Sequence, residues 1–171
     1  MPVVRNVHFI LLVVVLSLHH TVAIADRNKI NIDITTHLGD VRDFQEGDRL
    51  SLLMSLDMDA YILVLYQNST GNLIQLIPNK NQSKTYYNAG VFISLPESDA
   101  AFIFEIQPPF GRETLWAFAS DKPFPDFKGR YLEDGLKQLS VDIGAIRKKL
   151  SENEGYAFGE DSLIMDTHAR Q

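Results

Sequence analysis

Two stretches decide the fold of this 171-residue chain: AYILVLY at residues 60–66 and LIQLI at residues 73–77. Both are rich in the branched aliphatic and aromatic residues that favour β-strands. The segment between them, Asn68-Ser69-Thr70-Gly71, contains a glycine that can adopt the positive φ that hairpin loops often need. The two stretches are therefore predicted to pair as a β-hairpin.

Further strands are predicted on both sides of this hairpin. Residues 30–34 alternate isoleucine with polar residues, which is the period of a strand with one buried and one wet face. Other apolar runs are bounded by glycine or proline, which rarely continue a strand. These runs predict strands at residues 50–56, 91–95, 101–107 and 113–119, and a short edge strand within residues 156–166. Their spacing indicates a mainly β fold, which we predict to be an antiparallel β-sandwich.

Two of the predicted strands, at 60–66 and 113–119, are apolar on both faces and need cover on both sides. Residues 130–152 repeat apolar side chains at spacings of three and four, which is the stripe of an amphipathic helix. Gly135 and Gly144 weaken helix propensity by about 1 kcal/mol each relative to alanine, so a kinked or broken helix is an alternative. We predict one C-terminal helix at about 130–152 that covers a sheet. Its apolar stripe consists of Leu132, Leu136, Leu139, Ile143, Ile146 and Leu150.

The N-terminal 25 residues have the pattern of a secretory signal peptide. Arg5 supplies the positive charge, residues 9–18 form an apolar run, and Ala23-Ile24-Ala25 is a small-x-small cleavage site. The run is shorter than the roughly 20 residues that cross a bilayer, although a retained membrane anchor is the alternative. We expect export to the periplasm or the extracellular space, with residues 26–171 forming a single domain.

Composition excludes several classes of function. The formal net charge is -6 at pH 7, and an acidic chain without a basic cluster is a poor partner for nucleic acid or for an anionic membrane surface. The chain has no cysteine, which excludes disulfides and thiol catalysis. Outside the predicted signal peptide the histidines are His37 and His168, too few for a multi-histidine metal site or a histidine-based catalytic triad.

Carboxylates offer the remaining route to chemistry. Asp57 and Asp59 lie two residues apart at a strand junction, where paired carboxylates can hold calcium or perform hydrolysis. A second acidic group lies in one loop and consists of Asp40, Asp43, Glu46 and Asp48. The simpler interpretation is that both sets are turn residues that bond backbone N–H groups. We therefore predict that the protein is not an enzyme and needs no metal or cofactor.

Aromatic residues provide a second candidate site. Tyr86, Tyr87 and Phe92 are close in sequence to the polar loop at residues 79–84, so a sugar ring or a peptide could stack there. Packing in the core and at its rim is the alternative interpretation. The candidate binding residues are Asp57, Asp59, Asn79, Tyr86 and Tyr87.

The order of several short motifs resembles a bacterial family known as domain of unknown function 4384, over about residues 38–125. The matching positions are Phe44, Glu46-Gly47-Asp48, Leu50, residues 59–66, Gly71, Leu76-Ile77-Pro78-Asn79, Ala89-Gly90, Leu95-Pro96, Gly111, Glu113 and Leu115. Members occur in exported or envelope proteins, sometimes beside protein kinase or caspase-like domains. No such catalytic domain is attached here, so the resemblance implies an accessory module and supplies no catalytic residues.

The sequence thus favours an exported, non-catalytic binding module whose partner is another protein of the envelope or the extracellular space. A carbohydrate-binding domain that uses Tyr86 and Tyr87 is the alternative. A carboxylate hydrolase that uses Asp57 and Asp59 is a third reading.

Overall fold

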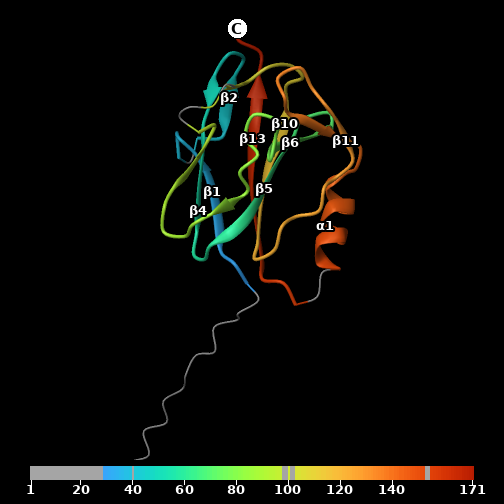
Figure 1. Ribbon diagram of the computed structural model, residues 1–171. Helices are drawn as coiled ribbons and strands as arrows, with labels where there is room; N and C mark the ends of the chain where they lie inside the picture. The colour runs from blue at the N-terminus through green and yellow to red at the C-terminus, as the bar shows by residue number, and fades with distance from the viewer. Residues whose placement is uncertain (1–28, 40, 98–99, 101–102, 153–154) are drawn as a thin grey trace, which may run out of the picture.

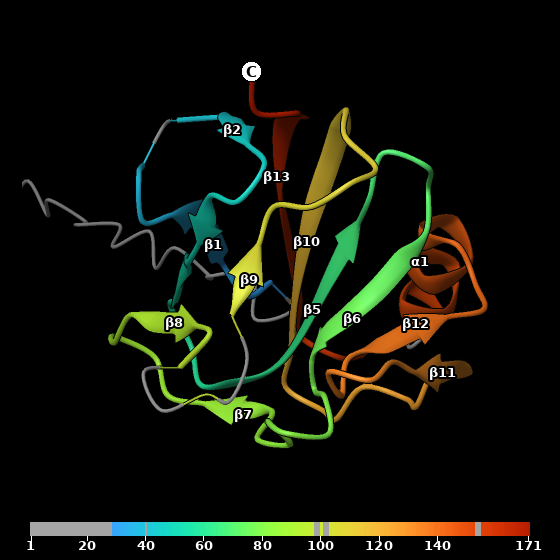
Figure 2. The same ribbon diagram turned by 90° about the horizontal axis from the view of Figure 1, so that it is seen from above.

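A computed structural model describes residues 29–39, 41–97, 100, 103–152 and 155–171, and these residues form three layers (Figures 1 and 2). A small sheet lies on one side of a large central sheet, and a short helix lies on the other side. The signal peptide predicted for residues 1–25, and its cleavage site, lie outside the described residues.

The central sheet contains eight strands, and its pairs are antiparallel except for β13 with β2, which is parallel. Strand β7 (Tyr86–Tyr87) pairs with β5 beside the main path. The main path runs in the order β11 (Gly129–Tyr131), β12 (Lys137–Leu139), β6 (Leu73–Ile77), β5 (Ala60–Gln67), β10 (Arg112–Ser120), β13 (Phe158–His168) and β2 (Asp43–Gln45). The predicted hairpin is confirmed as β5 and β6, which pair with Tyr66 opposite Ile74.

The small sheet has the order β1 (Ile32–Thr36), β4 (Leu52–Leu56) and β8 (Ile93–Leu95), and a separate pair joins β3 (Arg49–Leu50) to β9 (Phe104–Glu105). The strands predicted at 30–34, 50–56, 91–95 and 113–119 therefore exist within a few residues of their predicted bounds. The prediction at 101–107 is represented by β9, and its first two positions lie outside the described residues. The fold is mainly β and sandwich-like, as predicted.

The central strands β5 and β10 are buried on both faces over much of their length. Successive residues of a strand point to opposite sides of the sheet, so each face packs against a different layer. On one face, Ile62 and Val64 of β5 pack in a cluster with Met54 of the small sheet. On the other face, Leu63 and Leu65 pack in a second cluster that includes residues of the helix. The doubly apolar composition of the central strands thus has a direct structural explanation.

The predicted helix at 130–152 is wrong over its first half, because residues 129–139 form the hairpin β11–β12. Gly135 has a φ of +86° in the turn of this hairpin, which a helix interior does not allow. The helix α1 covers only Ile143–Ser151, and it begins where the Asp142 carboxylate accepts a hydrogen bond from the Ala145 N–H at 2.7 Å. Its buried residues Ile146 and Leu150 contribute to the second cluster.

The C-terminal strand β13 is not the short edge strand predicted within 156–166. It has 11 residues and lies between β10 and β2, with nine of its residues in register with β10. Figure 1 shows it as the long red arrow through the middle of the molecule. Leu163 and Met165 lie on one face of β13 and are buried in the first cluster. The strand therefore contributes to the hydrophobic core although it lies near the C-terminus.

Among the described residues, no helix combines the length and the apolar composition that a membrane span requires.

Candidate functional site

Asp57 and Asp59 lie at the junction between β4 and β5, and both are exposed. The Asp57 carboxylate accepts two hydrogen bonds from Asn31, one from the backbone N–H at 2.8 Å and one from Nδ2 at 2.7 Å. The Asp59 Oδ1 atom accepts a hydrogen bond from the Ala89 N–H at 2.8 Å. These carboxylates fasten β4 and β5 to segments distant in sequence, one before β1 and one before β8.

Asn79 organises the loop that follows β6. Its Nδ2 atom donates to the Leu76 carbonyl at 2.7 Å, and its Oδ1 atom accepts from the N–H groups of Asn81 and Gln82, each at 2.7 Å. The side chain is only 5% exposed. Both the oxygen and the nitrogen of the amide therefore take part in holding the loop conformation.

Tyr87 is also 5% exposed and belongs to the same hydrogen-bonded group. Its hydroxyl accepts from Gln82 Nε2 at 3.1 Å and lies 3.2 Å from Glu97 Oε1. Burial raises the pKa of Tyr87 to about 12, so the hydroxyl keeps its proton for donation to Glu97. The structure thus joins Asn79 to Tyr87 through Gln82, whereas Asp57 and Asp59 form hydrogen bonds elsewhere.

An apolar surface adjoins Tyr87 and contains the most exposed aromatic side chain among the described large hydrophobic residues. Phe92 is 81% exposed and Val91 is 57% exposed. Tyr86 is 45% exposed but packs edge to face on Tyr61, with ring centres 4.9 Å apart. A hollow of about 390 Å³ lies beside Val91 and Phe92 and includes Lys84 and Glu97 in its lining. We call Val91, Phe92 and this hollow the Phe92 surface, and Tyr86 is not among the residues that line it.

The acidic loop identified in the sequence faces the C-terminal residues instead of a shared centre. Asp48 lies 3.3 Å from an Arg170 guanidinium nitrogen, and Asp43 lies 3.4 Å from a His168 ring nitrogen. Glu46 is exposed, and Asp40 lies outside the described residues. Within the described part of the chain, no three histidine, aspartate or glutamate side chains gather as metal ligands would.

Glu113 at the start of β10 is a buried carboxyl group that is not among the candidate site residues predicted from the sequence. The residue is 1% exposed, and neither carboxyl oxygen makes a hydrogen bond of ordinary geometry. The hydroxyl groups of Tyr66 and Thr167 are its polar neighbours. Burial raises the pKa of Glu113, because a low-dielectric environment disfavours the charged form. A period-two reading of β10 identifies this position, because Glu113 falls on the same face as the buried Leu115 and Ala117.

Replacing Glu113 by glutamine is expected to stabilise the protein increasingly as the pH rises. With a pKa raised above the usual 4.5, the folded wild type holds a proton that the unfolded chain loses, so its stability falls as the pH rises from 4.5 through the folded pKa. Glutamine carries no charge and does not titrate. Urea unfolding should show a difference in free energy of unfolding between Glu113→Gln and the wild type that widens as the pH rises above about 4.5.

The matched control for this titration is Glu133→Gln, which removes an exposed carboxylate. Its stability should follow the wild-type curve. A gap between Glu113→Gln and wild type that stays constant over the pH range would show that Glu113 titrates alike in the folded and unfolded states.

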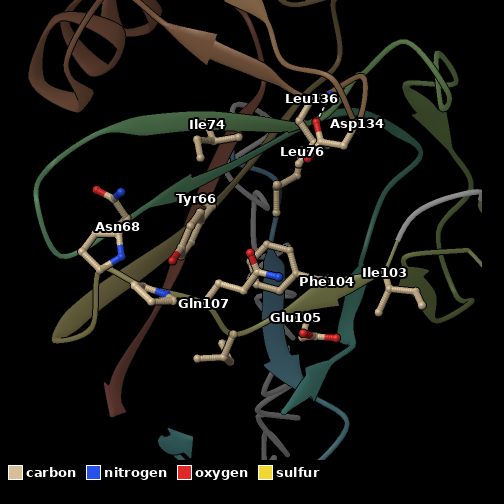
Figure 3. Close-up of a pocket in the computed structure, with 13 residues that line it drawn as sticks. Tyr66, Asn68, Ile74, Leu76, Ile103, Phe104, Glu105, Gln107, Asp134 and Leu136 are labelled. Carbon is tan, nitrogen blue, oxygen red and sulfur yellow. Dashed lines mark hydrogen bonds between the residues drawn. The ribbon is translucent and has the colours of Figure 1, made fainter. Parts of the chain in front are cut away.

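A separate cavity of about 260 Å³ lies between β5, β6 and the segment around β9 and is partly open to solvent (Figure 3). Tyr66, Ile74 and Leu76 supply the sheet side, and Phe104 stands opposite them. The turn between β11 and β12 closes a third side with Asp134 and Leu136. None of the five residues selected from the sequence lines this cavity.

Comparison with known proteins identifies a family resemblance for part of the chain. No curated protein and no solved structure matches the chain. A family model described as a domain of unknown function (DUF4384) matches residues 43–123, close to the span of about 38–125 expected from the sequence motifs. The matched segment runs from β2 through β10 and ends before β11, α1 and β13. Residues 43–123 of this chain thus resemble the DUF4384 domain family.

Proposed function

We propose that the protein is an exported, non-catalytic binding module that recognises another protein through the Phe92 surface. The observation that carries this proposal is the 81% exposure of the Phe92 side chain beside the hollow. Contiguous exposed apolar side chains on a soluble protein commonly mark an interaction site. The signal-peptide pattern at the N-terminus supports a location in the periplasm or outside the cell.

The register of β8 keeps Phe92 in solvent. Ile93 and Leu95 are buried in the first cluster, so the alternation of the strand directs Phe92 and Ser94 outward. Phe92 could turn inward only if Ile93 left the core. The exposed ring is thus built into the fold, and burying it against a partner would contribute about 1.5–3 kcal/mol.

The polar margin of the hollow favours a protein partner. Lys84 and Glu97 contribute one charge of each sign, and Lys84 Nζ lies 4.6 Å from the centre of the Tyr87 ring. An apolar centre with a charged margin is the usual composition of a protein interface. The absence of a catalytic role is supported by the carboxylates Asp57 and Asp59, which accept hydrogen bonds that fasten the fold.

Site-specific photo-crosslinking tests the proposal in expressing cells. A photoreactive residue at position 92 should give one discrete crosslinked protein, which mass spectrometry identifies. The control is the same residue at position 164, because Ile164 is also an exposed hydrophobic residue but lies on β13 of the central sheet. Position 164 should not give that product, and Val91→Asp should abolish it at position 92.

Two results would contradict a protein partner. The first is an equal pattern of products from positions 92 and 164. The second is retention of the purified protein on a polysaccharide column that is lost in Tyr86→Ala and Phe92→Ala, which would favour the carbohydrate-binding alternative.

A further inference from the structure

The 260 Å³ cavity between β5, β6 and residues 103–109 has a composition unlike that of the Phe92 surface. Its walls come from three segments far apart in the sequence, and Figure 3 shows their side chains facing a common space. A preformed hollow of this kind, with an apolar wall and a few polar groups, is the usual form of a small-ligand site.

The apolar wall is held in place by packing. Tyr66 and Phe104 meet edge to face with ring centres 5.2 Å apart. Ile74, Leu76 and Leu136 complete the wall, and each packs in or against the first hydrophobic cluster. A cavity of about 150 Å³ accommodates a benzene ring, so 260 Å³ has room for an apolar body of roughly hexyl or phenethyl size.

The charges at the cavity are of one sign. Glu105 and Asp134 line it and are exposed, whereas no lysine, arginine or histidine is among the described lining residues. The Asp134 Oδ1 atom accepts from the Leu136 N–H at 3.0 Å, which holds this carboxylate at the turn. Arg49 is the cross-strand partner of Glu105, but the two form no ion pair within 4.0 Å among the described residues.

Hydrogen-bonding groups also line the cavity. The Tyr66 hydroxyl and the amides of Asn68 and Gln107 belong to the lining. Asn68 already accepts hydrogen bonds from Thr70 and Asn72 through Oδ1, so its Nδ2 atom is the group left to face a ligand. The Tyr66 hydroxyl is also a polar neighbour of the buried carboxyl of Glu113, which lies outside the lining.

We infer that this cavity binds a small primary amine whose apolar body packs against Phe104, Leu76 and Leu136 and whose ammonium group pairs with Asp134 or Glu105 at the cavity margin. An ammonium group forms a charge-assisted hydrogen bond with a carboxylate, and the described lining residues include no cation of their own. The same chemistry exists in a free alkylamine and in a lysine side chain of a partner chain. This site is separate from the Phe92 surface, and either can exist without the other.

Calorimetric titration with three probes of matched body tests the inference. The probes are n-hexylamine, hexan-1-ol and hexanoate, added to the purified protein at neutral pH and low salt. Hexylamine should bind at least tenfold more tightly than hexanol, and hexanoate should not bind. Equal affinities for the amine and the alcohol, or no binding of the amine, would overturn the inference.

Variants locate the ammonium group. Glu105→Gln with Asp134→Asn should weaken hexylamine at least tenfold and leave hexanol unchanged. The control is Glu46→Gln with Glu152→Gln, which removes the same two charges from exposed positions outside the cavity lining. An equal loss of hexylamine affinity in both double variants would mean that the loss reflects the change in net charge. That result would contradict an ammonium site at the cavity.

Two further measurements distinguish a free amine from a lysine side chain as the ligand, and distinguish this cavity from the Phe92 surface. Binding of N-acetyl-lysine methylamide with an affinity similar to that of hexylamine would assign the site to a lysine side chain of a partner. Binding of hexylamine alone would assign it to a free amine. Phe92→Ala should bind hexylamine as the wild type does, so a failure of the Phe92 surface leaves this result intact.

Discussion

Replacing Phe118 by alanine is expected to lower the free energy of unfolding by about 3–5 kcal/mol. Phe118 is completely buried on the helix side of β10, where its ring stacks on Phe158 with centres 6.0 Å apart. The central sheet and α1 surround it, so the space left by alanine cannot readily close. The cost therefore combines the lost transfer energy of the ring with the energy of a cavity.

Urea unfolding followed by circular dichroism measures this cost. Ile164→Ala is the control, because Ile164 is 47% exposed on β13 and its loss should change stability by no more than about 0.5 kcal/mol. If Phe118→Ala cost no more than Ile164→Ala, the layer formed by α1 would not be a packed part of the domain.

The second large effect is expected for Gly159→Ala. A Cβ atom at position 159 would lie 2.0 Å from the Ile30 carbonyl oxygen and 3.0 Å from its carbon, both in the backbone. The Ile30 N–H also donates to the Phe158 carbonyl at 3.0 Å, so the segment before β1 is bonded tightly against β13. Alanine would force this segment away, with a cost of about 3 kcal/mol or more, at the upper end of overpacking.

Thermal unfolding measures the effect, and Ser162→Ala is the control on an exposed position of the same strand. The control should unfold close to the wild-type temperature, whereas Gly159→Ala should unfold well below it. Equal melting temperatures would mean that residues 29–30 do not lie against β13 as described.

The β-rich part of the fold could be predicted because its signals are local. The strands β5 and β6 are apolar runs separated by a loop in which Gly71 has a φ of +85°, so composition and turn chemistry agree. The resemblance to DUF4384 could also be predicted from the spacing of short motifs over much of the same segment.

The C-terminal third could not be predicted as well, because two local signals conflict there. Leu132, Leu136 and Leu139 have helical spacing, but the turn at Gly135 pairs β11 with β12. A Cβ atom at Gly129 would lie 2.3 Å from the Gln138 carbonyl oxygen, which shows how closely the two strands approach. Strand order is a tertiary property, so the central place of β13 has no signal in its own sequence.

The candidate site residues were likewise predictable only where a local sequence pattern was sufficient. Asp57, Asp59 and Asn79 were selected for their chemistry, yet Asp57 and Asp59 bond to partners 26 and 30 residues away that a sequence pattern does not reveal. The exposure of Phe92 follows from the register of β8, and the burial of Glu113 from that of β10. The alternation of residues along each strand therefore indicated both the exposure of Phe92 and the burial of Glu113. It could not indicate which residues of neighbouring strands lie beside them.

The affinity of the purified protein for the partner crosslinked at position 92 is the most direct measure of the proposed binding role. Phe92→Ala should weaken binding at least tenfold, which corresponds to about 1.4 kcal/mol, while Ile164→Ala should bind as the wild type does. Both variants alter exposed side chains and should keep the wild-type stability within about 0.5 kcal/mol. Undiminished affinity in Phe92→Ala would contradict the assignment of this surface as the binding site.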